Sequence, residues 1–324
     1  MYISYAKISD NLQENQHLFY SMRALVISGG GSKGAFAGGV AEYLIKHQKK
    51  EYDILVGTST GSLLISHLAL GKIETLKELY SNVNQSTIFS NNPFKVKGKG
   101  EVKTVSINHF KVIKNLLKKK KTFGESQNLR NLLHKNIDDS FFKELLATQK
   151  DLVITVSNLT EGKIEYKSIK DCDRTQFVDW LWASCNYIPF MSLYEKDNYQ
   201  YADGGFGALV PIRAAIEKGA KEIDVIILDT EVKLVANMPA KNPFSLITGI
   251  LNFTLEHVRK HNVTIGKLTA KQKGVHLNLY YTPTILTTNS LIFDKKLMTR
   301  WWRQGFVYAS LKHRGADKNE IRDH

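Results

Sequence analysis

A serine between two glycines is the residue best placed to do chemistry in this sequence. Gly57, Thr58, Ser59, Thr60 and Gly61 form a G-x-S-x-G pattern, with a short apolar run before it and an apolar helical pattern after it. That context exposes a serine hydroxyl at the end of a strand and directs a helix N-terminus at it, which favours a developing anion. The pattern is short enough to occur by chance, so an ordinary strand-to-helix turn is the alternative.

A second glycine-rich turn also follows a strand and opens a helix. Its residues are Gly29, Gly30, Gly31, Ser32, Lys33 and Gly34. Backbone N–H groups in such a loop are unobstructed by side chains and can hold the oxyanion formed when a serine attacks a carbonyl. A dinucleotide site would need an acid after the next strand, but Asp53 precedes that strand. A Walker A loop would need lysine where Ala35 stands. Nucleotide binding and a plain tight turn are the alternatives.

A carboxylate closes a third strand candidate. Asp203 follows residues 200–202, and the two glycines after it, Gly204 and Gly205, let other backbone approach closely. If this strand runs parallel to the one before Ser59, the carboxylate lies at the same edge of the sheet as the serine. Taken alone, Asp-Gly is a common turn.

In order and in strand-end context, the three motifs together resemble those of the patatin-like phospholipases. That family carries G-G-G-x-[KR]-G, then G-x-S-x-G, and D-G-[GA] well downstream. The likeness covers roughly residues 23–311. It extends to Ala35-Phe36, Gly39-Val40, Trp182-Ala183-Ser184, Ile188-Pro189, Tyr201, Pro211, Phe293-Asp294, Trp301 and Gly305-Phe306. Thr60 departs from the usual alanine, and Gly207-Ala208 replace an asparagine pair found in many members.

The resemblance implies a Ser-Asp dyad that cleaves carboxylic esters of lipids, of the phospholipase A or lysophospholipase type, without a metal or organic cofactor. Ser59 would attack the ester, Asp203 would take its proton, and the backbone of residues 29–32 would hold the oxyanion. A carboxylate is a weak base at its ordinary pKa of about 4, so this acid should work best when partly desolvated. A conventional triad is the alternative, because His257, His261 and His276 follow Asp203, although none stands in a motif. His257 and His261 are four residues apart on a predicted helix with Arg259 and Lys260, a composition that indicates a solvated face.

Apolar runs predict the elements that position these residues. Strands are expected at 24–27, 54–56, 151–156, 200–202, 223–228 and 275–281, and helices at 60–70, 212–218, 244–273 and 294–311, with another after the first glycine turn through Leu44. Strand, glycine turn and helix repeated in succession is typical of a parallel sheet covered by helices. The sequence therefore predicts a three-layer α/β sandwich with a mostly parallel central sheet flanked by helices, as in the patatin-like fold.

One acyl hydrolase domain is expected over residues 23–312, between a polar extension at 1–22 and a polar tail at 313–324. The length of 324 residues favours a single α/β domain with insertions. A basic insertion is expected at about 90–122, where ten lysines face only Glu101, giving +9 of the chain's +14 net charge. Lys95–Lys121 could contact an anionic membrane surface, and a solvated charged face is the alternative.

Composition narrows the class of protein further. A sequence pI of about 9.5 suits anionic partners. A nucleotide-binding or nucleic-acid-associated protein, using Gly29–Gly34 and the lysines, is therefore the alternative function, although no specific nucleic acid is expected. Cys172 and Cys185 lack metal-ligand spacing and are predicted to be buried thiols. A secretory signal and a membrane-length apolar run are both missing from the sequence, so we expect a cytoplasmic enzyme with peripheral membrane contact. The oligomeric state is left open.

Overall fold

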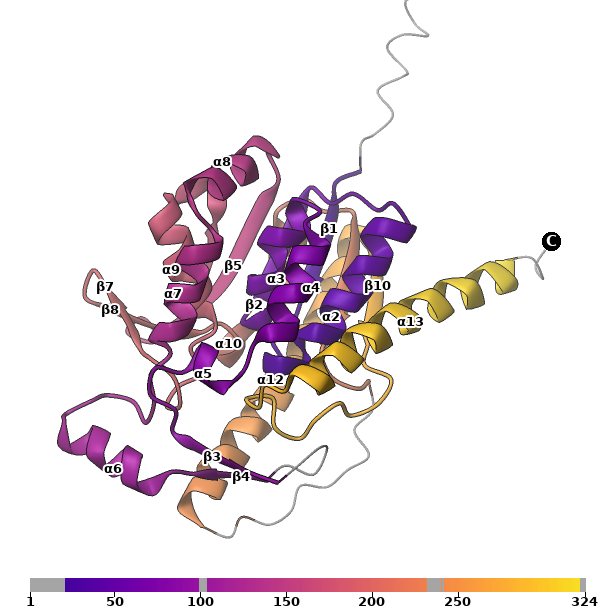
Figure 1. The fold of residues 1–324 in the computed structure, drawn as a ribbon. Helices are drawn as coiled ribbons and strands as arrows, with labels where there is room; N and C mark the ends of the chain where they lie inside the picture. The colour runs from indigo at the N-terminus through magenta and orange to yellow at the C-terminus, as the bar shows by residue number, and fades with distance from the viewer. Residues whose placement is uncertain (1–20, 99–103, 232–239, 241, 321–324) are drawn as a thin grey trace, which may run out of the picture.

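The computed structural model describes residues 21–98, 104–231, 240 and 242–320 (Figure 1). All but the last two residues of the extension expected at 1–22 lie outside this range. Within the described residues, an eight-stranded sheet has the order β10-β9-β1-β2-β5-β8-β7, and β6 also pairs with β5. The parallel strands are β10 (His276–Tyr281), β9 (Glu222–Ile227), β1 (Arg23–Ile27), β2 (Ile54–Thr58) and β5 (Asp151–Asn158). The antiparallel strands are β6 (Lys163–Ser168), β7 (Tyr194–Lys196) and β8 (Tyr199–Asp203).

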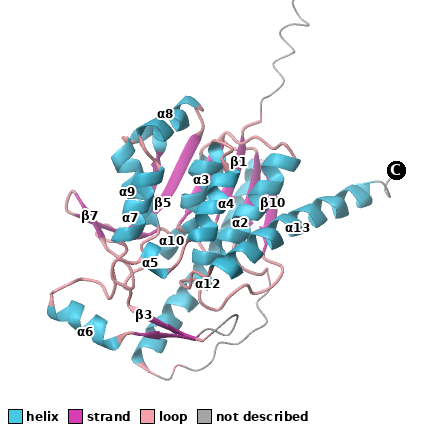
Figure 2. Cartoon of the chain, viewed as in Figure 1, coloured by secondary structure: helices cyan, strands magenta, loops and turns pink. Residues whose placement is uncertain are grey.

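Helices cover both faces of the sheet, because its strands are apolar on both sides (Figure 2). In β1, Leu25 and Ile27 face one helix layer, and Ala24 and Val26 face the other. The first layer contains α2 (Gly34–Glu42), α3 (Thr60–Ala69), α4 (Ile73–Asn82), α9 (Arg174–Ser184) and α13 (Lys295–Glu320). The second contains α11 (Ile212–Glu217) and α12 (Pro243–Lys273). This arrangement confirms the predicted three-layer sandwich.

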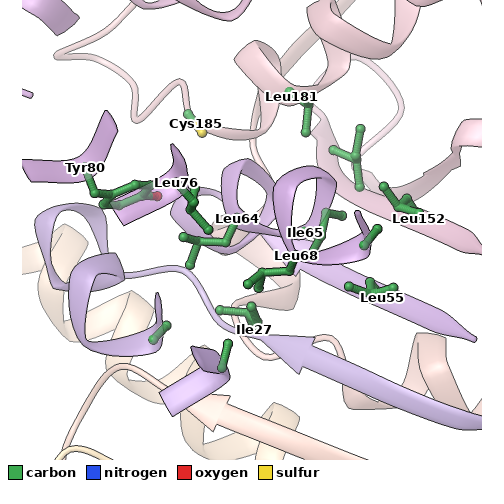
Figure 3. Packing of buried hydrophobic residues seen from close by; sticks show 14 of the residues in the cluster. Ile27, Leu55, Leu64, Ile65, Leu68, Leu76, Tyr80, Leu152, Leu181 and Cys185 are labelled. Atoms are coloured by element: carbon green, nitrogen blue, oxygen red, sulfur yellow. The ribbon is translucent and has the colours of Figure 1, made fainter. Parts of the chain in front are cut away.

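The first helix layer makes the larger core. Figure 3 shows Ile65 and Leu68 of α3 packed against Ile27 and Leu55 of the sheet. These side chains are almost fully buried. The turn that carries Ser59 leads directly into α3, so the same packing that builds the core also fixes the start of that helix.

Helices α2 and α13 cross at very short range. A Cβ atom on Gly39 would lie 1.9 Å from the Trp302 carbonyl oxygen, and one on Gly305 would lie 2.1 Å from the Phe36 carbonyl oxygen. The Trp302 indole donates a hydrogen bond to Glu42 across the same contact. α13 continues to Glu320, so helical backbone runs well into the segment expected to be a polar tail.

The lysine-rich segment has regular structure in its described part. β3 (Phe94–Lys97) and β4 (Thr104–Ile107) form a separate antiparallel pair, and α6 (His109–Leu117) follows. In Figure 1 they lie at the lower end of the molecule, beside the N-terminal part of α12. Lys99, Glu101 and Lys103 lie outside the described residues. The remaining short helices are α5 (Gln85–Ile88), α7 (Gln127–Asn136), α8 (Asp139–Ala147) and α10 (Gly205–Ala208).

The direction of β8 differs from the parallel arrangement considered from the sequence. β5 uses one edge for β6 throughout residues 153–158. On its other edge it pairs with β2 up to Thr155 and then, beyond the end of β2, with β8, where Val156 is the partner of Asp203. β2 and β8 therefore approach one another head-on along a single edge of β5. Because β5 extends beyond the end of β2, the antiparallel strand β8 can pair with that extension and place Asp203 next to the end of β2.

Candidate active site

Ser59 lies at a strained turn between β2 and α3. Its φ is 54°, a left-handed conformation that a residue other than glycine rarely adopts. Close contacts on both sides of Ser59 require residues without a side chain. A Cβ atom on Gly57 would lie 2.4 Å from the Ser62 amide nitrogen, and one on Gly61 would lie 2.2 Å from the Ile27 carbonyl oxygen. The glycines of the G-x-S-x-G pattern are therefore required by the tightness of the turn.

Ser184 ties this turn to the sheet. The backbone N–H of Ser59 donates to the Ser184 hydroxyl oxygen at 2.9 Å, and that hydroxyl donates to the Thr155 carbonyl at 2.7 Å. On the other side, the Ser62 hydroxyl donates to the Ser59 carbonyl at 2.6 Å. Both polar groups of the Ser59 backbone are thus held by buried side chains. In the sequence, Ser184 is marked only by the family likeness, because its hydrogen bond to the Ser59 N–H depends on the tertiary fold.

Asp203 lies beside Ser59 at the end of β8 and is buried. Its carboxylate accepts a hydrogen bond from the Gly205 N–H at 2.7 Å, and the Ser59 side chain lies within reach of the same carboxylate. Burial raises the pKa of Asp203 to about 6, and the Ser59 side chain and the Gly205 N–H limit the rise because they favour the charged form. A Cβ atom on Gly204 would lie 2.3 Å from the Thr155 carbonyl oxygen, so glycine is needed there for the close approach to β5.

The glycine loop offers two N–H groups rather than the predicted set of four residues. The Gly29 N–H donates to the Leu209 carbonyl at 3.1 Å, and the Ser32 N–H donates to the Ser290 carbonyl at 2.8 Å. Among the described residues, no acceptor is found for the N–H of Gly30 or Gly31. Gly31 has a φ of 54°. The available donors of the loop are therefore Gly30 and Gly31.

The glycine loop and the turn at Ser59 also pack directly on one another. A Cβ atom on Gly34 would lie 2.3 Å from Oγ1 of Thr60, whose hydroxyl is 2.7 Å from the Tyr80 hydroxyl. A Cβ atom on Gly29 would lie 3.3 Å from Cβ of Ser59. Thr60, which departs from the family pattern, thus occupies the space that glycine leaves at position 34.

A cavity of about 580 Å³ brings the predicted residues together. Ser59, Asp203 and residues 29–31 line it, whereas the Ser32 side chain is fully buried beneath the loop. Much of the wall is apolar, with contributions from Leu63, Ile88, Phe94, Leu129, Phe190, Met191, Leu209, Leu228, Phe244 and Leu255. A cavity of this kind suits a substrate with a hydrocarbon portion next to a polar reacting group.

The histidines considered for a triad lie elsewhere. His257 and His261 are exposed on α12, and His276 is exposed at the start of β10, the opposite end of that strand from the cavity. None of the three lines the cavity. His109, at the start of α6, does line it, with its ring centroid 4.9 Å from that of Phe244. No sequence motif marks His109, because its place depends on how the lysine-rich segment folds back over the cavity.

Two side chains differ from their sequence interpretation. Arg259 was expected on a solvated helix face, but it is buried at the cavity wall, where Glu256 accepts a hydrogen bond from it at 2.7 Å and Asp229 lies 3.7 Å away. Cys172 is only half-buried, whereas Cys185 is buried, and both are free thiols. The Cys185 thiol adjoins Ser59, and burial, reinforced by the Asp203 charge, raises its pKa well above the usual range. That thiol is therefore kept neutral.

Two further properties concern the described part of the chain as a whole. It contains no group of three or more His, Cys, Asp or Glu side chains arranged to hold a metal ion. None of its helices combines the length and the apolar character needed to cross a bilayer.

Comparison with known proteins places the chain in a family. The crystal structure of VipD from Legionella pneumophila aligns with 13% sequence identity and a TM-score of 0.47, covering 90% of this chain and 66% of that one. A search of curated proteins finds no match. The model of the patatin-like phospholipase family matches residues 25–216, more than half of the chain, and this region contains the glycine loop, the serine turn and Asp203. The chain therefore belongs to the patatin-like phospholipase family.

Proposed function

We propose that this protein hydrolyses carboxylic esters of lipids, as a phospholipase A or lysophospholipase, with Ser59 as nucleophile and Asp203 as base. The observation that carries the proposal is the placement of the Ser59 side chain beside a buried carboxylate whose pKa is raised to about 6, at the wall of an apolar cavity. Family membership supports lipid acyl hydrolysis in general. The dyad and the type of lipid are inferences from the site.

The acylation step follows from this geometry. Oγ of Ser59 attacks the acyl carbonyl carbon while its proton passes to the Asp203 carboxylate, and the carbonyl oxygen becomes an oxyanion. The N–H groups of Gly30 and Gly31, with the N-terminus of α3, are available to stabilise that charge. The tetrahedral intermediate then collapses, the bond from carbon to the leaving oxygen breaks, and the proton moves from Asp203 to the departing alcohol.

Deacylation repeats the cycle with water. Asp203 takes a proton from water as the water oxygen attacks the acyl-serine carbon, and the proton then returns to Oγ of Ser59 as the fatty acid leaves. A base of raised pKa suits both halves, because general-base catalysis is most effective when the pKa of the base lies near the working pH. The apolar wall would hold the acyl chain, as expected for a lipid substrate.

Replacement of the two residues tests the dyad. Ser59→Ala and Asp203→Asn should each remove nearly all turnover of p-nitrophenyl butyrate, since neither leaves a nucleophile paired with a base. The double variant should lose little more than either single one, because residues that act as a unit are strongly non-additive. Ser81→Ala, on α4 and outside the cavity lining, is the matched control. A fluorophosphonate should label the wild-type chain and not Ser59→Ala. Near wild-type turnover by a folded Ser59→Ala variant would rule out the proposal.

The same assay decides between a dyad and a triad. Gln in place of His257, His261, His276 or the cavity-lining His109 should leave turnover within a few-fold of wild type. If any one of these variants loses activity a thousand-fold while its circular dichroism spectrum is unchanged, a histidine base is required and the dyad is wrong.

A further inference from the structure

The short helix α6 presents its apolar side to solvent. Phe110, Ile113 and Leu117 are 76%, 56% and 80% exposed, and their spacing of three and four residues places them on one face. The opposite face carries Val112 and Asn115, which are buried against the protein. A surface helix of a globular protein normally buries its apolar stripe, so this orientation indicates an interaction surface.

The N-terminal half of α12 has the same inverted arrangement. Leu246, Ile250 and Phe253 are 54%, 55% and 63% exposed and follow one face of the helix at spacings of four and three. Polar residues on the other side of the same turns, Thr248 and Asn252, line the cavity. The helix therefore separates the cavity from solvent and directs apolar side chains outward.

The two helices belong to one rim around the cavity mouth. The Phe244 ring of α12 lies 4.9 Å from the His109 ring of α6 and 5.8 Å from the Phe123 ring, measured between centroids. The cavity passes between these elements, since Val105 and Ile107 of β4 line it together with Phe244. Figure 1 places α6, the β3–β4 pair and the start of α12 at the same end of the molecule. We call this surface, Phe110–Leu117 with Leu246–Phe253, the apolar rim.

Charge indicates what covers the apolar rim. Lys111, Lys114, Lys118 and Lys119 are exposed in or directly after α6, and none forms an ion pair among the described residues. Lys120 and Lys121 instead pair with Glu125 and Glu195. No acidic residue occurs between residues 104 and 124. Basic side chains beside protruding apolar ones match a surface with anionic headgroups above hydrocarbon. A second copy of this chain would bring the same positive charge.

We propose that the apolar rim binds an anionic lipid surface, inserting Phe110, Ile113, Leu117, Leu246, Ile250 and Phe253 among the lipids while the free lysines contact headgroups. In this orientation the cavity mouth faces the lipid surface that contains the proposed substrate. The purpose of this binding rests on the proposed function, but vesicle binding itself requires no catalysis.

Sedimentation with vesicles tests the apolar rim apart from the chemistry. Binding is measured in the Ser59→Ala background, on vesicles of phosphatidylglycerol or of phosphatidylcholine. The first triple variant changes Phe110, Ile113 and Leu117 to Ser, and the second changes Leu246, Ile250 and Phe253 to Ser. The matched control changes Leu146 and Leu311, which are exposed and remote from the rim, to Ser. A fourth variant replaces the four free lysines by Gln.

We expect the Ser59→Ala protein to bind phosphatidylglycerol vesicles, and each triple variant to bind at least tenfold more weakly at low and at high salt. The lysine variant should lose mainly the salt-sensitive part of binding, because salt screens exposed charges. The control should bind normally. In an active background, the triple variants should keep their turnover of soluble p-nitrophenyl butyrate and lose hydrolysis of vesicle lipid.

Four results would overturn the inference: undiminished binding by both triple variants, an equal loss in the control, equal binding to neutral and anionic vesicles, or a stable dimer by light scattering that the triple variants dissociate. Failure of Ser59 as the nucleophile would appear instead as esterase activity in Ser59→Ala. That outcome leaves the sedimentation result unaffected, so the two ideas fail separately.

Discussion

Burial and hydrogen bonding shift the pKa of the Asp203 carboxyl group in opposite directions. Burial raises its pKa to about 6, and the Ser59 side chain and the Gly205 N–H oppose the rise. The charged form is therefore costly but available at neutral pH. This is the balance that a carboxylate base needs, because a fully solvated one would be too weak and an unsupported buried one would stay protonated.

The pH dependence of turnover follows from this value. A base with a pKa of about 6 is ionised above that pH and protonated below it. We expect kcat/KM for p-nitrophenyl butyrate to be flat from about pH 7 to 8 and to fall tenfold per pH unit well below 6. Stopped assays across this range measure it. A profile that stays flat down to pH 4.5 would assign the base to a carboxyl of ordinary pKa.

The same carboxyl should reduce the stability of the fold. Its folded-state pKa lies above the unfolded value of about 4, so the folded protein binds more protons between these values, and its free energy of unfolding falls as pH rises through that window. Two units correspond to about 2.7 kcal/mol. Asp203→Asn removes the charge and should be more stable than wild type at pH 7 by up to about that amount. At pH 4 the two should converge. Urea unfolding at both pH values provides the comparison, and equal stabilities at pH 7 would contradict the prediction.

At the scale of elements, the crossing of α2 and α13 leaves no room for a side chain. Gly39→Ala places a Cβ atom 1.9 Å from the Trp302 carbonyl oxygen, which is backbone and cannot rotate away. We expect a loss of about 1–3 kcal/mol in the free energy of unfolding, the usual cost of overpacking. Gly249→Ala, with open space around it on an exposed turn of α12, should instead gain up to about 1 kcal/mol from helix propensity. Urea midpoints of both variants decide whether the crossing is as tight as described.

Local chemistry explains which features could be predicted from the sequence. The serine turn and the glycine loop are recognisable from the sequence because each requires glycine at fixed positions. Those positions are close together in the sequence, so they form a visible motif. The parallel strands follow from continuous apolar runs, which require cover on both faces. The direction of β8 could not be predicted, because a strand's direction depends on the partner edge it finds. Here that edge is the extension of β5 beyond Thr155.

Tertiary context also explains the misplaced side chains. Arg259 lies between His257 and His261 and directly before Lys260 on a long helix, a composition typical of a solvated face, but the helix passes directly over the cavity. Glu256, one turn earlier, supplies the carboxylate that makes burial of the guanidinium tolerable. His109 reaches the cavity only because the lysine-rich segment folds back against Phe244. No local sequence pattern predicts the burial of Arg259 or the position of His109 at the cavity.

At the scale of the whole molecule, charge and apolar exposure are concentrated at one end. The lysine-rich segment and the start of α12 lie at the lower end of the fold in Figure 1, and both contribute residues to the cavity lining. The strand ends opposite the site carry paired charges instead, such as Lys50 with Asp224 and Arg23 with Glu222. The molecule is thus polarised along the strand direction, with the cavity and the unpaired lysines at the same end.

The extension of β5 has a consequence for how such a chain can vary over evolutionary time. Ser59 and Asp203 are far apart in sequence, yet each takes its position from the edge of the same strand, one on either side of the boundary between Thr155 and Val156. The register with which β2 and β8 pair with β5 therefore sets the distance between Ser59 and Asp203. Segments between residues 60 and 150 can lengthen, shorten or be exchanged without changing that register. A lineage can thus redesign the approach to the cavity while Ser59 and Asp203 keep their relative geometry.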